Sequence, residues 1–104
     1  MSEIYRVADF IADFIAGMGV KHVFLLPGGG AMHLVDAVGR CRDIEVVACL
    51  HEQAASISAE AYARVNEHIG VAMVTTGPGA TNAITGVAGA WIESVPLMII
   101  SGQV

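Results

Sequence analysis

The chain has 104 residues, of which 55% are hydrophobic and 14% are charged, so it is too apolar to stay disordered in water. This length suits one domain built around one core. The formal net charge is −5, with ten acidic residues, five basic residues and no basic cluster. A nucleic-acid partner would need an electropositive surface, so we expect none.

The cysteines and the N-terminal segment indicate a cytoplasmic protein. Cys41 and Cys49 have the spacing of neither a zinc pair nor a dithiol redox motif, and we expect buried, reduced thiols. The first helix-like segment carries Glu3, Asp9 and Asp13 within its apolar pattern. A secretory signal would not contain these acids.

One uncharged window is long enough to cross a bilayer. It runs from Glu67 to Glu93, with no formally charged residue between them. Its centre, TTGPGATN, is polar and breaks helices, and lipid would leave its backbone groups without partners. We therefore expect a strand, a turn and a helix buried by protein, and no membrane contact.

The first half of the chain alternates between helical and extended patterns. A first helix, closed by Gly19, is predicted to bury one apolar face, made of Val7, Phe10, Ile11, Phe14, Ile15 and Met18. A strand over 22–26 ends at PGGG, and a helix follows over 31–41. The next strand, 44–50, is apolar at nearly every position, as expected when both faces of a sheet are covered.

The second half continues the alternation. An alanine-rich helix over 52–65 is predicted to pack through Ile57, Ala61 and Tyr62. A strand over 71–74 leads into the TTGPGATN turn, and the last strand is 97–100. Between them a helix over 82–92 is predicted, with Ile84, Val87, Ala88 and Trp91 at helical spacing. This order predicts an α/β fold with an open parallel sheet wrapped by helices.

The unusual residues gather at the carboxyl ends of the predicted strands, where open parallel sheets bind ligands. PGGG follows the first strand, His51-Glu52 the second, TGPGATN the third and Ser101-Gly102-Gln103 the fourth. An apolar sheet interior does not explain glycines and a carboxylate at one edge. We therefore expect four loops to meet there.

Glu52 is the most informative acid, and two interpretations stay open. It is either a first-turn acid that complements the helix dipole, or a partly desolvated carboxylate that shares or relays a proton. His51 is either a structural hydrogen-bonding residue or the neighbour of Glu52 in that chemistry.

The glycine runs are weaker signals. Gly28, Gly29 and Gly30 permit close approach of a ligand, but a tight turn also favours glycine. Gly77-Pro78-Gly79 is more specific, because it places a rigid kink just before a helix, with Thr81 and Asn82 able to cap the helix or reach a ligand.

Other ligand sites fit less well. Gly28-x-Gly30 with Glu52 downstream resembles a dinucleotide fingerprint, but His33 stands where Gly or Ala is needed. No Gly-Lys-Ser/Thr follows a glycine run, which excludes a nucleoside triphosphate loop. Metal binding is poorly supported, because the histidines lack paired ligand spacing: they are His22, His33, His51 and His68.

Three segments together resemble the start of the pyrimidine-binding domain of thiamine diphosphate-dependent enzymes, and most closely the acetolactate synthase group. They are VFLLPGGGAMHLVDAV, HEQAASISAEAYARV and GVAMVTTGPGATNAITGVAGAWIESVPLMIISGQV. The resemblance implies a thiamine diphosphate-binding fold of the pyrimidine-domain type, incomplete at the C-terminus. It also implies that residues 1–104 are the N-terminal part of this domain, with the central and diphosphate-binding domains absent.

The resemblance assigns roles to matching positions. Glu52 would be catalytic, as the glutamate that hydrogen-bonds the ring nitrogen of the cofactor's aminopyrimidine. The other implied cofactor-binding residues are Pro27, Gly28, Gly29, His51, Gly77, Pro78, Gly79 and Asn82. The implied substrate-pocket residues are Gly30, Ala31, His33 and Gln103. No metal ligand is expected in this chain.

The implied activity is decarboxylation and carboligation of 2-keto acids, with pyruvate as donor, as in branched-chain amino acid biosynthesis. Magnesium would be held by the missing diphosphate-binding domain, and FAD is a further cofactor of some acetolactate synthases. The complete enzyme would be a homodimer or larger, or would pair with a separate diphosphate-binding subunit, and this chain would be inactive alone. The alternatives are a non-catalytic small-molecule or partner-binding module that keeps a half-site, and a dinucleotide-binding domain.

Overall fold

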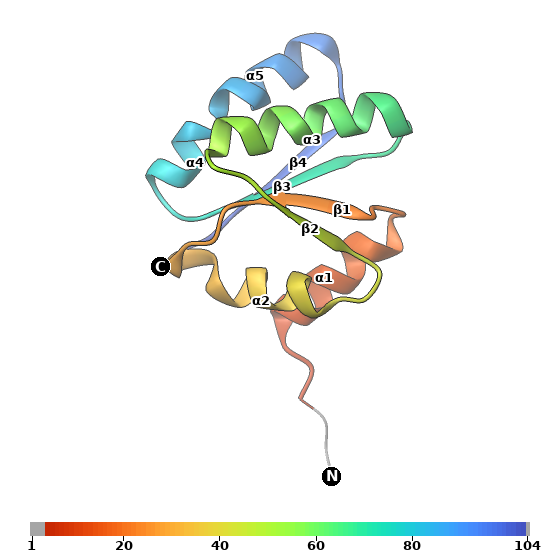
Figure 1. The fold of residues 1–104 in the computed structure, drawn as a ribbon, viewed down its shortest axis with the longest axis vertical. Coiled ribbons are helices and arrows are strands. Elements are labelled where there is room, and N and C mark those ends of the chain that lie inside the picture. The colour runs from red at the N-terminus through yellow and green to blue at the C-terminus, as the bar shows by residue number, and fades with distance from the viewer. Residues whose placement is uncertain (1–3, 104) are drawn as a thin grey trace.

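A computed structural model describes residues 4–103 and shows helices alternating with strands (Figure 1). In chain order the elements are α1 (Val7–Gly17), β1 (His22–Leu25), the 3₁₀ helix η1 (Gly29–Ala31), α2 (Met32–Arg40), β2 (Glu45–Ala48), α3 (Glu52–Asn66), β3 (Gly70–Val74), α4 (Pro78–Asn82), α5 (Ile84–Glu93) and β4 (Leu97–Ser101). Gly19 follows α1 with a φ of +86°, a conformation that favours glycine, so the predicted end of the first helix is confirmed.

The strands form one parallel sheet in the order β2-β1-β3-β4. Figure 1 shows α1 and α2 on one side of this sheet and α3, α4 and α5 on the other. The predicted α/β class, with an open parallel sheet wrapped by helices, is confirmed.

The core follows the alternation of side chains along the central strands. One cluster joins β1 and β3 to α1 and α2, through Val23, Leu25, Val71, Met73, Ala12, Ile15, Ala37 and Val38. The other joins Ala72 of β3 to Ala55 and Ala59 of α3, with Phe24, Leu97 and Ile99 packed against them. Because β3 lies inside the sheet, all five of its residues are buried.

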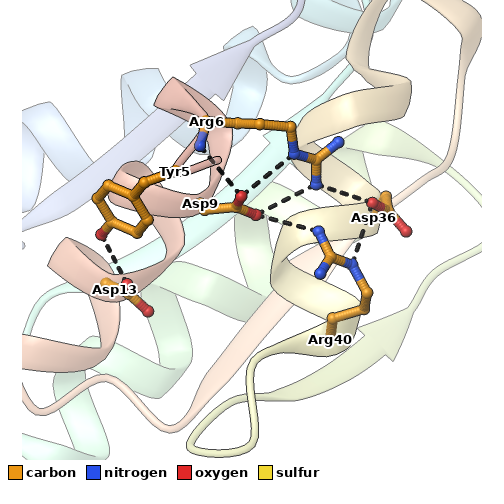
Figure 2. Close-up of polar contacts among 6 residues, drawn as sticks. All are labelled: Tyr5, Arg6, Asp9, Asp13, Asp36 and Arg40. Carbon is orange, nitrogen blue, oxygen red and sulfur yellow. Dashed lines mark hydrogen bonds and ion pairs between the residues drawn. The ribbon is translucent and has the colours of Figure 1, made fainter. Parts of the chain in front are cut away.

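A network of ion pairs joins α1 to α2 (Figure 2). Arg6 bridges Asp9 at 3.1 Å and Asp36 at 3.0 Å, and Arg40 bridges the same two carboxylates at 3.1 and 3.2 Å. The pKa values of Asp9 and Asp36 both lie below the ordinary value, mainly because the Arg6 side chain donates hydrogen bonds to each carboxylate. Nearby, a hydrogen bond to Asp13 raises the pKa of Tyr5 to about 12.

The predicted packing face of α1 is partly wrong. Val7 is 76% exposed, and Phe10 and Phe14 are each 54% exposed, whereas Ala12 and Ile15 are buried. The apolar residues cover more of the helix circumference than one contact surface can use. The smaller Ala12 lies inward, and the two phenyl rings meet on the outer side at a centroid distance of 6.2 Å.

The packing residues of the later helices also differ from the prediction. In α3, Ile57 and Ala61 are exposed and Tyr62 is half-buried, and the buried residues are Ala55, Ser56, Ala59 and Ala63. In α5, Trp91 is 84% exposed, and Gly86 and Ala90 are buried. A Cβ added at Gly86 would overlap the Ser56 side chain. The two helices are therefore close enough that only small side chains fit between them.

The second strand is not covered on both faces as expected. Glu45 and Ala48 are exposed and the two residues between them are half-buried, because β2 lies at an edge of the sheet. The strand is also shorter than predicted, and Leu50 beyond it is fully exposed. Strand order decides this burial, and the apolar pattern does not report strand order.

Two further expectations are corrected. The predicted turn at Pro78–Asn82 is itself the short helix α4, because proline is well tolerated in a first helical turn, and α5 follows after Ala83. Cys41 and Cys49 are free but half-buried, not buried, and burial raises the pKa of the Cys49 thiol. Within residues 4–103, no helix is long and apolar enough to cross a membrane.

Candidate functional site

The loops that follow β1, β3 and β4 are joined at the carboxyl edge of the sheet. The Gly30 amide donates to Thr75 Oγ1 at 3.2 Å, which connects the first loop to the third. The Ser101 hydroxyl donates to the Thr75 carbonyl at 3.3 Å, and the Gly102 amide donates to the Val74 carbonyl at 2.9 Å. The predicted meeting of loops at this edge is therefore present in the structure.

Glu52 joins the same edge from the loop after β2. It is the first residue of α3 and is half-buried. Its Oε1 accepts a hydrogen bond from Asn82 Nδ2 at 3.2 Å. Asn82 is the last residue of α4, so the fold pairs two predicted site residues that are thirty positions apart.

Gly79 lies beside the other carboxylate oxygen, and Thr75 fills the space where a side chain on Gly79 would be. Gly79 is buried, and an added Cβ would lie 3.7 Å from Glu52 Oε2 and 2.9 Å from Thr75 Cγ2. Among the described residues, Glu52 Oε2 accepts no hydrogen bond. The site therefore presents a carboxylate with one oxygen fixed by Asn82 and the other oxygen beside a residue that has no side chain.

His51 has a structural task. Its side chain is exposed, and Nδ1 accepts a hydrogen bond from the Gln53 amide at 3.0 Å, which caps the N-terminus of α3. The structural interpretation of this histidine is confirmed by that bond. Its contact with a cofactor stays a prediction.

The Gly77-Pro78-Gly79 turn needs its first glycine. Gly77 has φ +57° and ψ −116°, which side chains rarely allow, and Pro78 then begins α4. Thr81 Oγ1 donates to the Pro78 carbonyl at 3.2 Å, so Thr81 stabilises its own helix. Of the two candidate capping residues, Asn82 is the one that reaches Glu52.

The glycines after β1 have different surroundings. An added Cβ at Gly28 would lie 2.5 Å from Thr75 Cβ, and one at Gly30 would overlap the Thr76 methyl group, whereas one at Gly29 would meet nothing within 4 Å. Close approach of the next loop therefore requires Gly28 and Gly30. Six residues line a shallow hollow at the start of α2: Pro27, Gly28, Gly29, Met32, Val35 and Asp36.

The remaining predicted substrate-pocket residues are more dispersed. Ala31 is 1% exposed, so its methyl group lies in the protein interior. His33 and Gln103 are exposed, and no hydrogen bond among the described residues connects either side chain to Glu52. Their role in a substrate pocket stays a prediction. Residues 4–103 contain no group of three or more His, Cys, Asp or Glu side chains that could hold a metal ion.

The sequence analysis did not single out Thr75, and it named Ser101 only as part of the Ser101-Gly102-Gln103 segment after the fourth strand. Both follow or end apolar strands, and both contribute to the contacts between loops. Thr75 is the first polar residue after the wholly buried β3, and that position was the available signal.

Comparison with known proteins gives the family. Residues 5–104 match the family described as "Thiamine pyrophosphate enzyme, N-terminal TPP binding domain". The chain therefore belongs to the N-terminal pyrimidine-binding domains of enzymes that use thiamine pyrophosphate, which is another name for thiamine diphosphate. This membership favours thiamine diphosphate over the dinucleotide alternative.

Within the family, the chain is similar to acetolactate synthase large subunits. It is 44% identical over 102 residues to that of Buchnera aphidicola subsp. Schizaphis graminum and, over the same length, to isozyme 3 of Escherichia coli K12. It is 47% identical over 96 residues to "Acetolactate synthase, mitochondrial" of Schizosaccharomyces pombe. These matches cover 92–98% of this chain but only 14–18% of the relatives.

Proposed function

We propose that this chain supplies the aminopyrimidine-binding half of a thiamine diphosphate site in an acetolactate synthase-like enzyme that acts on 2-keto acids, with pyruvate as donor. The carrying observation is the 3.2 Å hydrogen bond from Asn82 to Glu52 at the carboxyl edge of the sheet, beside the bare backbone of Gly79.

The residues present fit an aminopyrimidine. This flat ring offers two ring nitrogens and an exocyclic amino group as polar atoms and otherwise needs close contact with protein surface. Glu52 Oε2 is available for a ring nitrogen, and Gly79 presents bare backbone beside that oxygen. A larger residue at Gly79 would clash with Thr75 Cγ2, 2.9 Å from an added Cβ, and would displace this backbone.

In this proposal, Glu52 holds a proton shared with the ring nitrogen. Asn82 fixes the carboxylate by binding Oε1, so that Oε2 is the oxygen that faces the ring. Half-burial of Glu52 limits competition from water, and the Gly77–Gly79 backbone approaches the ring. When bound, thiamine diphosphate would supply the electron sink that takes up the electron pair left behind when a 2-keto acid loses carbon dioxide.

The rest of the active site is proposed to lie elsewhere. Magnesium and the diphosphate group would be held by another domain or a separate subunit, and any FAD would bind mainly outside this chain. We accordingly propose a homodimer or larger assembly for the active enzyme and no activity for residues 1–104 alone. The proposed setting is branched-chain amino acid biosynthesis in the cytoplasm, which cell fractionation would test.

The experiment is Glu52→Gln in the full-length protein that contains this chain. Glutamine keeps the shape but cannot share the proton, so acetolactate formation from pyruvate should fall by at least about 100-fold. Circular dichroism should show the same fold. The matched control is Glu60→Gln on the same helix, where the carboxylate pairs with Arg64 at 2.8 Å, and it should keep near-normal turnover.

Near-normal turnover of Glu52→Gln would contradict the proposed role of this carboxylate. Calorimetric titration of the wild-type protein with thiamine diphosphate and magnesium should give saturable binding. Absence of binding would overturn the proposed function itself.

A further inference from the structure

We propose that Thr75 is a positioning residue that holds the Gly28–Gly30 turn and the Gly77–Gly79 turn at a fixed separation across the site. This inference rests on the proposed function, because it places Gly30 in the substrate pocket and the Gly77–Gly79 turn beside the cofactor. Thr75 follows β3 directly and lies between the two turns in the fold.

The polar groups of Thr75 are engaged with both neighbouring loops. Its Oγ1 accepts from the Gly30 amide at 3.2 Å, so the hydroxyl fixes the end of the first turn. Its backbone carbonyl accepts from the Ser101 hydroxyl at 3.3 Å, which connects it to the end of β4. Residues from three separate strand ends therefore meet at this threonine.

The carbon atoms of Thr75 occupy the space between the glycines. A Cβ added at Gly28 would lie 2.5 Å from Thr75 Cβ, and one added at Gly79 would lie 2.9 Å from Thr75 Cγ2. The same added atom at Gly79 would lie 3.7 Å from Glu52 Oε2. The Thr75 methyl group thus contacts the turn that borders the carboxylate, while the hydroxyl contacts Gly30, which is expected to line the substrate pocket.

Threonine combines the two contacts, and two substitutions separate them. Thr75→Val keeps the branched shape but removes the acceptor, which leaves the Gly30 amide without this partner. Thr75→Ser keeps the hydroxyl but removes the methyl group that packs against Gly28 and Gly79. A positioning role therefore predicts a different defect in each variant: weaker catalysis in Thr75→Val and weaker cofactor binding in Thr75→Ser.

The experiment measures both sides of the site in the full-length protein. For Thr75→Val, amide hydrogen exchange at Gly30 should become about tenfold faster and kcat/KM for pyruvate should fall about tenfold, with the Kd for thiamine diphosphate within about twofold of wild type. For Thr75→Ser, Gly30 exchange should stay near wild type, and the Kd for thiamine diphosphate should rise by about tenfold or less.

The neighbouring Thr76 provides a control variant. Thr76→Val removes the neighbouring hydroxyl, which makes no hydrogen bond within the described residues, and should leave Gly30 exchange unchanged. Unchanged Gly30 exchange in Thr75→Val would overturn the inference. So would equal losses of kcat/KM and of cofactor affinity in both variants, if those losses follow the fall in the midpoint of unfolding. Absence of thiamine diphosphate binding to the wild-type protein would instead overturn the proposed function. The Gly30 exchange measurement separates the two outcomes, because it does not depend on cofactor.

Discussion

Ser56 and Gly86 show how a single side chain limits the packing of two helices. Ser56 is fully buried, and its hydroxyl donates to the Gln53 carbonyl at 3.1 Å. A Cβ at Gly86 would lie 2.6 Å from Ser56 Cβ. We predict that Gly86→Ala lowers the free energy of unfolding by about 1–3 kcal/mol, measured by urea denaturation, because α5 must move away from α3.

Gly39→Ala is the matched control. Gly39 lies in α2 with nothing within 4 Å of an added Cβ, so alanine should raise the free energy of unfolding by about 0.5–1 kcal/mol. Equal changes at positions 39 and 86 would show that helix propensity, and not close packing, decides the effect.

At the residue level, sequence identified Glu52 and Asn82 but could not predict their hydrogen bond. Thirty positions separate them, and only the packing of α3 against α4 and α5 brings them together. Thr75 was not singled out for a related reason. A threonine at the end of a strand is ordinary in sequence, and its hydrogen bonds with Gly30 and Ser101, at two other strand ends, exist only in the folded sheet.

The ion pairs between α1 and α2 predict an acid-sensitive contact between these helices. The pKa values of Asp9 and Asp36 are lowered in the folded state, so their contribution to stability is present above the ordinary value near 4. It is lost as pH falls through the lowered values. In urea denaturation, the midpoint for wild type should therefore fall more steeply below pH 4 than that for Asp36→Asn.

High salt supplies the control for this prediction. The Asp36 side chain is 51% exposed, so about 1 M salt should screen its ion pairs and reduce the difference between wild type and Asp36→Asn. Parallel pH profiles at low salt would show that the network contributes nothing measurable to the α1–α2 contact.

The sequence predicted the order of the main helices and strands more reliably than the faces by which the helices pack. Alternating apolar segments separated by glycine and proline predicted this order. The first and last residues of the predicted elements differ by a few positions from those in the structure. The packing faces of α1 and α5 were not predictable from the pattern, because both helices carry apolar residues around most of their circumference. Close contact selected Ala12 and Gly86 for the interior and left Phe10 and Trp91 outside.

Across the whole molecule, the outer side of α5 exposes apolar surface. Trp91 is the only tryptophan and is 84% exposed. It lines a hollow with Val87, Ala90, Val95, Leu97 and Ile99. We predict that the 104-residue chain, when dilute, shows tryptophan emission close to that of the free amino acid in water and is readily quenched by acrylamide.

Concentration provides the second arm of this measurement. If self-association covers the α5 surface, the emission should shift to shorter wavelength as the protein concentration rises. Short-wavelength emission that resists quenching even in dilute solution would contradict the exposed position of Trp91.

The fold class was predictable at this largest scale because alternation of strands and helices favours a parallel sheet. The position of each strand in that sheet was not predictable. An apolar strand reads the same at the centre and at the edge, and so β2 was expected to be covered on both faces.

The packing of Thr75 against the glycine turns also has a consequence for how this sequence can change over evolutionary time. Gly28 and Gly79 lack room for a methyl group because Thr75 fills that room. An alanine at Gly79 becomes tolerable once position 75 has lost the threonine methyl group, whereas an alanine at Gly28 also requires the loss of Cβ at position 75. Substitutions at these three positions should therefore be epistatic, and a selected library should recover them as correlated sets and seldom as single changes.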